Sequence, residues 1–281
     1  MAEISAKDVA ALRKVTGAGM MDCKKALQET DGDIEAAKVW LREKGIAGAA
    51  KRAGRDADQG AIEVLVEGNV GALVELNCET DFVAKGDVFK NALTGLTRLV
   101  LAEGDTDLAA KTYEGGTVED FVKGLSGTLG EKIELGRVVR FEGGGGLIDG
   151  YKHVQNERGV VGVLVELTGV DAANAHAQEV AHDIALHIAS AAPRYVSRDQ
   201  VPTDEVERER SIFEAQTKEE GKPEQAWPKI VEGKLNGFFK TVALVEQSFV
   251  KDQKATIQSL VDGLGGSAAV ARFARVKIGE D

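Results

Sequence analysis

Side chains that commonly bind metal ions occur close together at His176, Glu179 and His182. On a helix, the spacing of Glu179 and His182 places two ligands on one face, as in di-metal helical bundles. Those centres also need facing carboxylates and a second Glu-x-x-His motif, and the sequence contains no second copy. We therefore expect surface or half-buried helical histidines and no metal site. His187, on the apolar stripe of the same segment, is expected to pack in the core.

The sequence lacks the motifs of several common enzyme classes. It has no G-x-x-x-x-G-K-[ST] phosphate loop and no G-x-S-x-G nucleophile elbow. The glycine run 143–146 is not followed by Lys-Ser/Thr and does not fit G-x-G-x-x-G, so we expect a flexible turn. Cys23 and Cys78 lack metal-ligand spacing and are expected to be small buried side chains. None of these motifs offers a catalytic residue.

The charge balance of the 281 residues bears on the partners that the chain can bind. Lys and Arg number 35 against 46 Asp and Glu, which gives a net charge of −11. An acidic chain repels phosphates, and aromatic residues for base stacking make up only 5%. This composition argues against direct nucleic-acid binding. No apolar run approaches the length of a membrane span and the start does not resemble a signal peptide, so we expect no membrane contact and a cytoplasmic location.

The segment 75–85 combines acidic, aromatic and polar residues where a predicted strand ends and a helix begins. Thr80 or Asp81 would be an ordinary helix N-cap, and Phe82 could then point into the core. A large apolar residue beside an acid at such a corner is also well placed to protrude, and a protruding Phe would anchor an interface. From the residues alone, the ordinary N-cap with Phe82 directed into the core is favoured over the protruding arrangement.

Residues 4–45 predict three short helices. Ser5 with Asp8 three positions later forms a capping box, and residues 16–19 end the first helix. Asp33 is expected to cap the third helix, and Gly45 to follow its end at the C′ position. The apolar spacing turns these residues inward: Val9, Leu12, Cys23, Ala26, Leu27, Ile34, Ala37 and Leu41, with Trp40 beside them. Residues 46–60, rich in Ala and Gly, are expected to form a linker that could be partly helical.

A change to a two-residue period predicts a β-hairpin. Residues 62–66 alternate, Gly68-Asn69 forms the turn, and residues 70–76 return. A helix-rich stretch from 83 to 135 and a strand at 138–141 follow. The segment 70–76 (VGALVEL) recurs at 161–167 (VGVLVEL), identical at six of seven positions. We expect two related α+β subdomains, each an antiparallel sheet with helices on one face.

The remaining sequence predicts a long helix at 172–191, a helical hairpin and a short return. Charged helical segments within 203–246 flank Gly221-Lys222-Pro223, so we expect two helices that meet at this break and project from the core. Apolar residues at helical spacing should hold the two arms together: Val206, Phe213, Trp227, Ile230, Val231, Phe238 and Val242. Residues 249–281 predict a strand, a helix at 256–264 and a strand at 270–278.

Two segments resemble the signatures of a known family. Residues 75–85 (ELNCETDFVAK) resemble one signature of the bacterial translation elongation factor Ts family, and residues 12–27 (LRKVTGAGMMDCKKAL) resemble the other. The resemblance implies an α+β fold with a small N-terminal three-helix, ubiquitin-associated-like module, a duplicated core of antiparallel sheet plus helices, a projecting αα-hairpin and a small C-terminal module. The implied boundaries are 1–55 for the N-terminal module with its linker, 56–142 for core subdomain N, 143–202 for the first part of core subdomain C, 203–246 for the hairpin, and 247–281 for the return to the core and the C-terminal module.

The resemblance also implies a function. Members of the family are guanine nucleotide exchange factors for elongation factor Tu: they bind the GDP-bound GTPase and promote GDP release during polypeptide elongation. The element that dislodges the partner's magnesium ion corresponds by position to Thr80, Asp81, Phe82 and Val83. This element does no bond chemistry, so the resemblance implies no catalytic residue, no cofactor and no enzymatic activity. Further partner contacts are expected at Leu12, Arg13, Gly19, Met20 and His153. His153 also fits a solvated position on an outer strand.

Two other functions stay open at this point. Small three-helix modules often only dock, so a plain binding or scaffold protein is one alternative. A metal-dependent enzyme that uses His176, Glu179 and His182 is the other. The sequence leaves open whether the chain associates with itself and what the hairpin 203–246 contacts.

Overall fold

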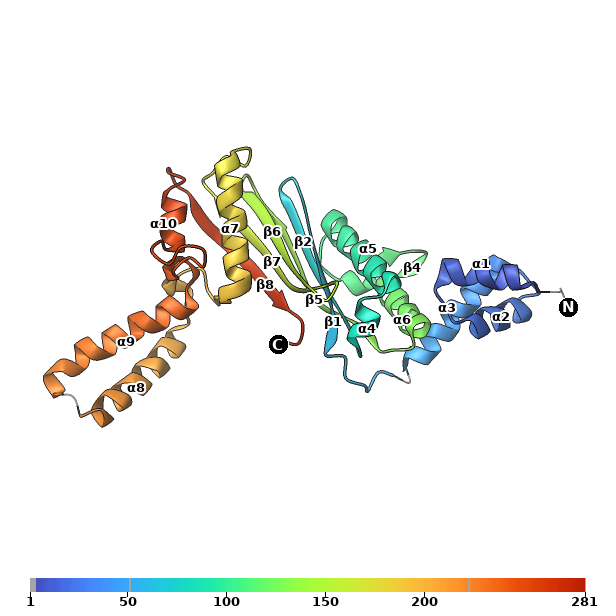
Figure 1. Cartoon of the computed structure of the whole chain (residues 1–281), viewed down its shortest axis with the longest axis horizontal. Coiled ribbons are helices and arrows are strands. Elements are labelled where there is room, and N and C mark those ends of the chain that lie inside the picture. The colour runs from blue at the N-terminus through green and yellow to red at the C-terminus, as the bar shows by residue number, and fades with distance from the viewer. Residues whose placement is uncertain (1–3, 51, 222, 281) are drawn as a thin grey trace.

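The computed structural model describes residues 4–50, 52–221 and 223–280. The molecule is elongated, with a bundle of three helices at one end, two β-sheets and their helices in the middle, and a pair of long helices at the other end (Figure 1). It is a mixed fold of helices and antiparallel sheets with an N-terminal helical region, as the sequence predicts. No helix within the described ranges is long and apolar enough to cross a membrane.

Three helices form the N-terminal bundle: α1 (Ala6–Thr16), α2 (Met20–Glu29) and α3 (Ile34–Ala50). Ser5 and Asp8 make the predicted capping box, and Gly17 ends α1 with a φ of 69°. Asp33 accepts hydrogen bonds from the amides of Glu35 and Ala36 at 2.9 and 3.0 Å. The small core of the bundle consists of Val9, Leu12, Ala18, Cys23, Ala26, Leu27 and Ala37.

One inward-facing position in this bundle is predicted wrongly. Ile34 is 37% exposed, because it is the first residue of α3 and burial on this helix begins one turn later at Ala37. Trp40 and Leu41 pack against the bundle core as expected.

The end of α3 is also predicted wrongly, because the helix continues past Gly45 to Ala50. Gly45 lies against α6 (Val118–Leu129), where it meets Gly124 and Gly127. A Cβ atom on Gly127 would lie only 2.1 Å from the Cα of Gly45, so the two backbones touch. Gly45 thus serves a close helix crossing that attaches the bundle to the rest of the molecule, and tertiary packing overrides its preference for a helix end.

The first sheet has the order β1 (Gln59–Glu67), β2 (Val70–Cys78), β5 (Ile133–Glu142), with all neighbours antiparallel. The predicted turn at Gly68-Asn69 joins β1 and β2. Between β2 and β5 the chain forms α4 (Asp81–Ala84), α5 (Asp87–Glu103) and α6. Residues 133–135 belong to β5 rather than to a helix, because Gly130 ends α6 in the left-handed conformation with a φ of 78°.

The second sheet repeats this construction with the order β6 (Leu147–Gln155), β7 (Arg158–Thr168), β8 (Ala269–Lys277). The glycine run 143–146 connects the first sheet to β6. The long helix α7 (Ala175–Ala191) packs on β6 and β7. The two copies of the sequence repeat therefore form the central strands β2 and β7 of the two sheets.

The two sheets face each other across an apolar layer. This layer consists of Ile62, Leu73, Phe141, Ile148, Leu164 and Val276, with Val64, Val66, Val139, Ala274 and Ile278 at its border. Helices α5 and α6 cover the outer face of the first sheet and α7 covers that of the second. Each repeat thus has helices on one face, as predicted, and the other repeat on the opposite face.

The repeats also place equivalent buried carboxylates on β2 and β7. Glu75 accepts a hydrogen bond from Nε of Arg137 at 3.2 Å, and Glu166 accepts one from Nε of Arg272 at 2.6 Å. Both carboxylates are buried. Because a buried charge without a partner is costly, each arginine neutralises its glutamate where a third strand joins the central one.

The predicted helical hairpin consists of α8 (Thr203–Glu219) and α9 (Trp227–Val242), which project from the sheets (Figure 1). Gly221, with a φ of 66°, lies at the break between them. The arms share an apolar seam formed by Val201, Val231, Leu235, Phe239 and Val242, with Tyr195, Val206, Phe213 and Phe238 at its edge.

The C-terminal segment differs from the prediction. No strand begins at residue 249; only an isolated bridge joins Ser248 to Thr256. After α10 (Ile257–Asp262), β8 pairs with β7 as the third strand of the second sheet. Residues 269–277 therefore return to the core as the third strand of the second sheet.

Short elements connect these parts. They are the 3₁₀ turns η1 (Leu108–Ala110), η2 (Arg198–Gln200), η3 (Glu224–Ala226) and η4 (Leu244–Glu246), and the small hairpin β3 (Thr112–Tyr113) and β4 (Gly116–Thr117).

Candidate functional site

A rigid corner forms where β2 ends and the single turn of α4 begins. Thr80 is the N-cap of α4: its Oγ1 accepts from the amide of Val83 at 3.4 Å. The same hydroxyl donates to Glu131 at 2.6 Å, and the amide of Thr80 donates to the other Glu131 oxygen at 2.9 Å. Glu131 follows α6, so the corner is fastened to a second segment of the first sheet's domain. We call residues 80–83 the corner.

Phe82 projects from this corner into solvent. Its side chain is 80% exposed, and it is the only aromatic among the exposed large apolar residues in the described part of the chain. Val83 and Ala84 on the same turn pack into the core of the first sheet, so the helical turn directs Phe82 outward. The inward orientation that the residues alone favour is therefore wrong, and the structure has the protruding one that the family resemblance implies.

Asp81 and Lys85 complete the outer surface of the corner. Lys85 Nζ donates to Asp81 Oδ2 at 2.5 Å and lies 5.5 Å from the centre of the Phe82 ring. The hydrogen bond from Lys85 holds the pKa of Asp81 below its usual range, and the positive charges of Lys85 and Arg158 add to this effect. The corner therefore presents an exposed ring beside an ionised carboxylate at neutral pH.

The residues before the corner are also held in place. Glu79 accepts from the amide of Lys132 at 2.6 Å and from Arg55 at 3.1 Å. Cys78 is fully buried, and its burial raises the pKa of the thiol to about 12. A thiol in this state is chemically inert, in keeping with the sequence expectation for Cys78.

Arg158 is a neighbour of the corner that sequence reasoning misses. It begins β7 in the second sheet, and its guanidinium reaches the start of β1 in the first. No motif or periodic pattern in the sequence distinguishes it, because the contact joins residues about a hundred positions apart.

The N-terminal contact candidates separate into one buried and three exposed residues. Leu12 is fully buried in the core of the three-helix bundle, so its side chain is not available for the expected partner contact. Arg13, Gly19 and Met20 are exposed, and Met20 is 59% exposed. An exposed methionine is well suited to an adaptable apolar contact.

His153 lies on β6, an edge strand of the second sheet. It is exposed, and its Nδ1 is 3.4 Å from the hydroxyl of Tyr151. Val154 beside it is 53% exposed. The rings of Tyr151 and His153 are stacked with their centroids 6.4 Å apart, and this surface is open to a partner.

Known proteins resemble this chain in both the corner and the three-helix bundle. A family model described as "Elongation factor TS" matches residues 79–280, and one described as "Elongation factor Ts, mitochondrial, N-terminal" matches residues 2–49. Curated proteins named "Elongation factor Ts" match along their whole length. The one from Micrococcus luteus is 47% identical over 284 residues, which cover 99% of this chain and 100% of the relative. The one from Thermobifida fusca is 49% identical over 287 residues, which cover all of both chains.

The chain belongs to the elongation factor Ts family. The first match begins at Glu79 and so includes the whole corner, whereas the second includes α1, α2 and most of α3. The matched ranges therefore include residues 12–27 and most of residues 75–85, the two segments that resemble family signatures.

The histidines of this family member are placed as follows. His176, Glu179 and His182 are exposed on α7, and His182 Nδ1 lies 3.0 Å from Asp149 Oδ2. The described residues include no group of three or more His, Cys, Asp or Glu side chains that could hold a metal ion. His187 is buried in the core, as predicted.

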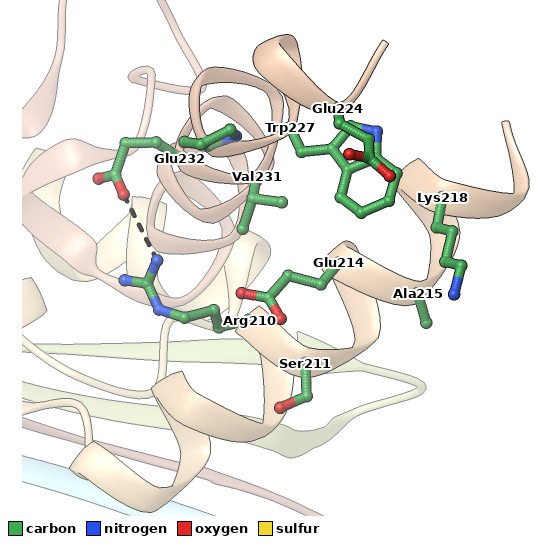
Figure 2. Close-up of a pocket in the computed structure, with 10 residues that line it drawn as sticks. Arg210, Ser211, Glu214, Ala215, Lys218, Glu224, Trp227, Val231 and Glu232 are labelled. Atoms are coloured by element: carbon green, nitrogen blue, oxygen red, sulfur yellow. Dashed lines mark ion pairs between the residues drawn. The ribbon is translucent and has the colours of Figure 1, made fainter. Parts of the chain in front are cut away.

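Two open cavities lie away from the tip of Phe82. One, of about 750 Å³, lies between α8 and α9, where Trp227 and Val231 face Glu214 and Ala215 (Figure 2). Its wall carries both signs of charge, and Arg210 pairs with Glu232 across it at 3.9 Å. The other, of about 640 Å³, lies between the three-helix bundle and helices α5 and α6. Residues 80–83 line neither cavity, and the exposed Phe82 ring suits contact with another macromolecule.

Proposed function

We propose that this protein is a guanine nucleotide exchange factor for elongation factor Tu and promotes GDP release during polypeptide elongation. Membership of the elongation factor Ts family supports the activity and the partner. The observation that carries the mechanism is the exposure of Phe82 on a corner fastened at Thr80. The protein acts by binding, with no covalent step, and works in the cytoplasm without direct nucleic-acid contact.

In this proposal the corner disturbs the magnesium site of the partner. Mg²⁺ requires near-ideal octahedral geometry at short distances, so a small shift of its supporting groups weakens nucleotide binding strongly. Phe82 enters an apolar gap in the partner as a wedge. Asp81 brings a negative charge that repels or repositions groups near the magnesium ion. Thr80 and Val83 keep the turn rigid.

The free energy gained by burying Phe82 is too small to drive nucleotide release by itself. Burial of a Phe side chain contributes about 1.5–3 kcal/mol. A thousandfold loss of nucleotide affinity needs a coupling free energy of about 4 kcal/mol. Other contacts must therefore hold the partner, and we propose Arg13, Gly19 and Met20 on the three-helix bundle and His153 on β6. By linkage, GDP weakens binding of the exchange factor by the same factor.

Two finer features of the fold belong to the same proposal. The matching sequence and construction of the two sheets support an origin by duplication of one α+β unit. The three helices at the N-terminus support a ubiquitin-associated-like docking module. Both are typical of the family that the sequence resembles.

The experiment is stopped-flow measurement of the release of fluorescent GDP from elongation factor Tu. We expect Asp81→Ala with Phe82→Ala to lower the maximal release rate at least tenfold while much of the binding remains. Ile212→Ala is a matched control, since Ile212 is an exposed apolar residue on the distant α8. Unchanged release by the double variant would reject the wedge mechanism. Absence of any acceleration by the wild-type protein would favour a plain binding module.

A further inference from the structure

Arg158 lies at the tip of the β6–β7 hairpin, next to the strand ends that carry the corner. It follows the turn residues Asn156 and Glu157, which both have positive φ values, and it is the first residue of β7. The same hairpin carries His153 on its outer strand, five positions before Arg158. One short hairpin of the second sheet thus carries both an exposed contact candidate and Arg158.

The guanidinium of Arg158 fastens this hairpin to the first sheet. Nη1 donates to the carbonyl oxygen of Gly60 at 2.6 Å, and Nη2 donates to Oε1 of Gln59 at 2.8 Å. Gln59 and Gly60 pair directly with Cys78 and Asn77 on β2. Only Glu79 separates that pairing from Thr80. Arg158 therefore holds the start of β1, which is paired with the end of β2 directly before the corner.

The hairpin packs closely on β1 at this point. A Cβ atom on Gly159 would lie 2.2 Å from the carbonyl oxygen of Ile62, so the two backbones are in contact. Lys152 on β6 pairs with Glu63 on β1. The positive charge of Arg158 also contributes to the lowered pKa of Asp81, after the hydrogen bond from Lys85. Arg158 is therefore linked to the corner in two ways: through its contacts with the strand ends and through its positive charge.

We propose that Arg158 is a positioning residue for nucleotide exchange. When the partner binds the β6–β7 hairpin, Arg158 transmits the resulting force to the Phe82 corner. The proposal rests on the proposed function. The arginine touches neither nucleotide nor magnesium ion; it acts through the start of β1 and the end of β2. A loosened corner would yield when pressed against the partner, so part of the binding free energy would no longer reach the magnesium site.

The test is a double-mutant cycle between Arg158 and Phe82 in the GDP-release assay, with the full-length chain and elongation factor Tu. Arg158→Gln should lower the maximal release rate about tenfold, in the range expected for charged hydrogen bonds. The concentration of exchange factor at half-maximal rate should change less than twofold. In the Phe82→Ala background the same substitution should have no further effect, because there is no ring left to position.

A second variant tests whether slower release by Arg158→Gln reflects only a loss of folding stability. Arg158→Lys keeps the charge and the reach for one of the two hydrogen bonds, and it should lower the maximal rate two- to threefold. Arg198→Gln is the matched control. Arg198 makes two hydrogen bonds to Glu246 at 2.6 Å and a third to Asn236 at 3.3 Å, but it lies at the base of the helical hairpin. It should leave the maximal rate within twofold of wild type.

The outcomes separate the two proposals. If Phe82→Ala slows release and both Arg158 substitutions act equally with or without Phe82, Arg158 works through an independent contact and the positioning role is overturned. A change only in the half-maximal concentration would overturn it as well. If the wild-type protein does not accelerate release, the proposed function fails; if it does and Phe82→Ala leaves release unchanged, the wedge mechanism fails. Amide hydrogen exchange at residues 80–85 of the free protein gives a separate readout: Arg158→Gln should accelerate it, and unchanged exchange would refute positioning.

Discussion

The side chain of Leu164 occupies the space that a side chain at Gly71 would need: a Cβ atom on Gly71 would lie 2.9 Å from Leu164 Cδ2. The reciprocal contact joins Gly162 and Leu73, where the corresponding distance is also 2.9 Å. Gly71 corresponds to Gly162 in the sequence repeat, and Leu73 corresponds to Leu164. Each sheet thus inserts its leucine at the glycine of the other, and one short motif specifies both halves of the contact.

This contact predicts opposite effects for two glycine substitutions. Gly71→Ala should lower the free energy of unfolding by about 1–3 kcal/mol, because the added methyl group overpacks the layer between the sheets. Gly237→Ala should raise it by about 0.5–1 kcal/mol, because Gly237 lies within α9 and a Cβ atom there meets nothing within 4 Å. Urea denaturation followed by circular dichroism measures both. A Gly71→Ala variant as stable as wild type would contradict the close packing.

The glycine crossing between α3 and α6 predicts that a single methyl group loosens the three-helix bundle. Gly127→Ala would place Cβ 2.1 Å from Gly45 Cα, and backbone atoms at this distance cannot yield by a rotamer change. Although Ala favours a helix more than Gly does, the clash should prevail and separate the helices. Amide hydrogen exchange in the last turns of α3 should rise, whereas Gly233→Ala, on the open side of α9, should leave it unchanged.

The contact between Lys85 and Asp81 predicts a shifted carboxyl titration. The hydrogen bond from Lys85 lowers the pKa of Asp81 below its ordinary value of 3.8, so Asp81 favours folding above that value and loses this contribution as the pH falls. Lys85→Met should move the pKa of Asp81 upward. Carboxyl NMR measures the change. Asp120 is the control: its pKa is held down chiefly by Thr117 and should not move.

Buried His187 predicts a loss of stability on mild acidification. Its Nε2 lies 2.9 Å from Oε1 of Gln247, and its Nδ1 accepts from the amide of Val250 at 3.3 Å. Burial lowers the pKa of His187 below the ordinary 6.5, so the unfolded chain takes up the proton first as the pH falls. The contribution is therefore complete above about pH 6.5 and decreases below it.

Comparison with a variant that cannot titrate tests this prediction. The difference in free energy of unfolding between wild type and His187→Gln should shrink from pH 8 to pH 5. Ile188→Val, a buried change beside it that does not titrate, should show a constant difference. If the His187→Gln difference is equally constant, the imidazole is not held neutral by the fold.

Features that depend on neighbouring residues could be predicted from the sequence. The capping box of Ser5 and Asp8, the Gly68-Asn69 turn and the break at Gly221 all follow from local backbone chemistry. The repeat of VGxLVEL also indicated two similar sheets. The role of its glycine as a contact point cannot be predicted in this way, because it exists only when the two sheets face each other.

Features that depend on distant contacts could not be predicted in this way. Gly45 has the chemistry of a helix end, yet α6 makes it a crossing point. Leu12 belongs to a signature of the family, yet it packs in a core. The residues alone favour Phe82 in the core, which is wrong because its orientation depends on how Val83 and Ala84 pack on the first sheet. Arg158 carries no local signal at all.

The order of the strands has a consequence for synthesis of the chain on the ribosome. β7 ends at Thr168, but the strand that covers its free edge does not begin until Ala269. While about a hundred residues emerge, including the whole helical hairpin, a nascent chain exposes an unpaired, strongly apolar β-edge, which is prone to pairing with other chains. Ribosome-bound intermediates that stop before residue 269 should therefore aggregate or recruit chaperones. Release from the chaperones should follow translation of the last strand.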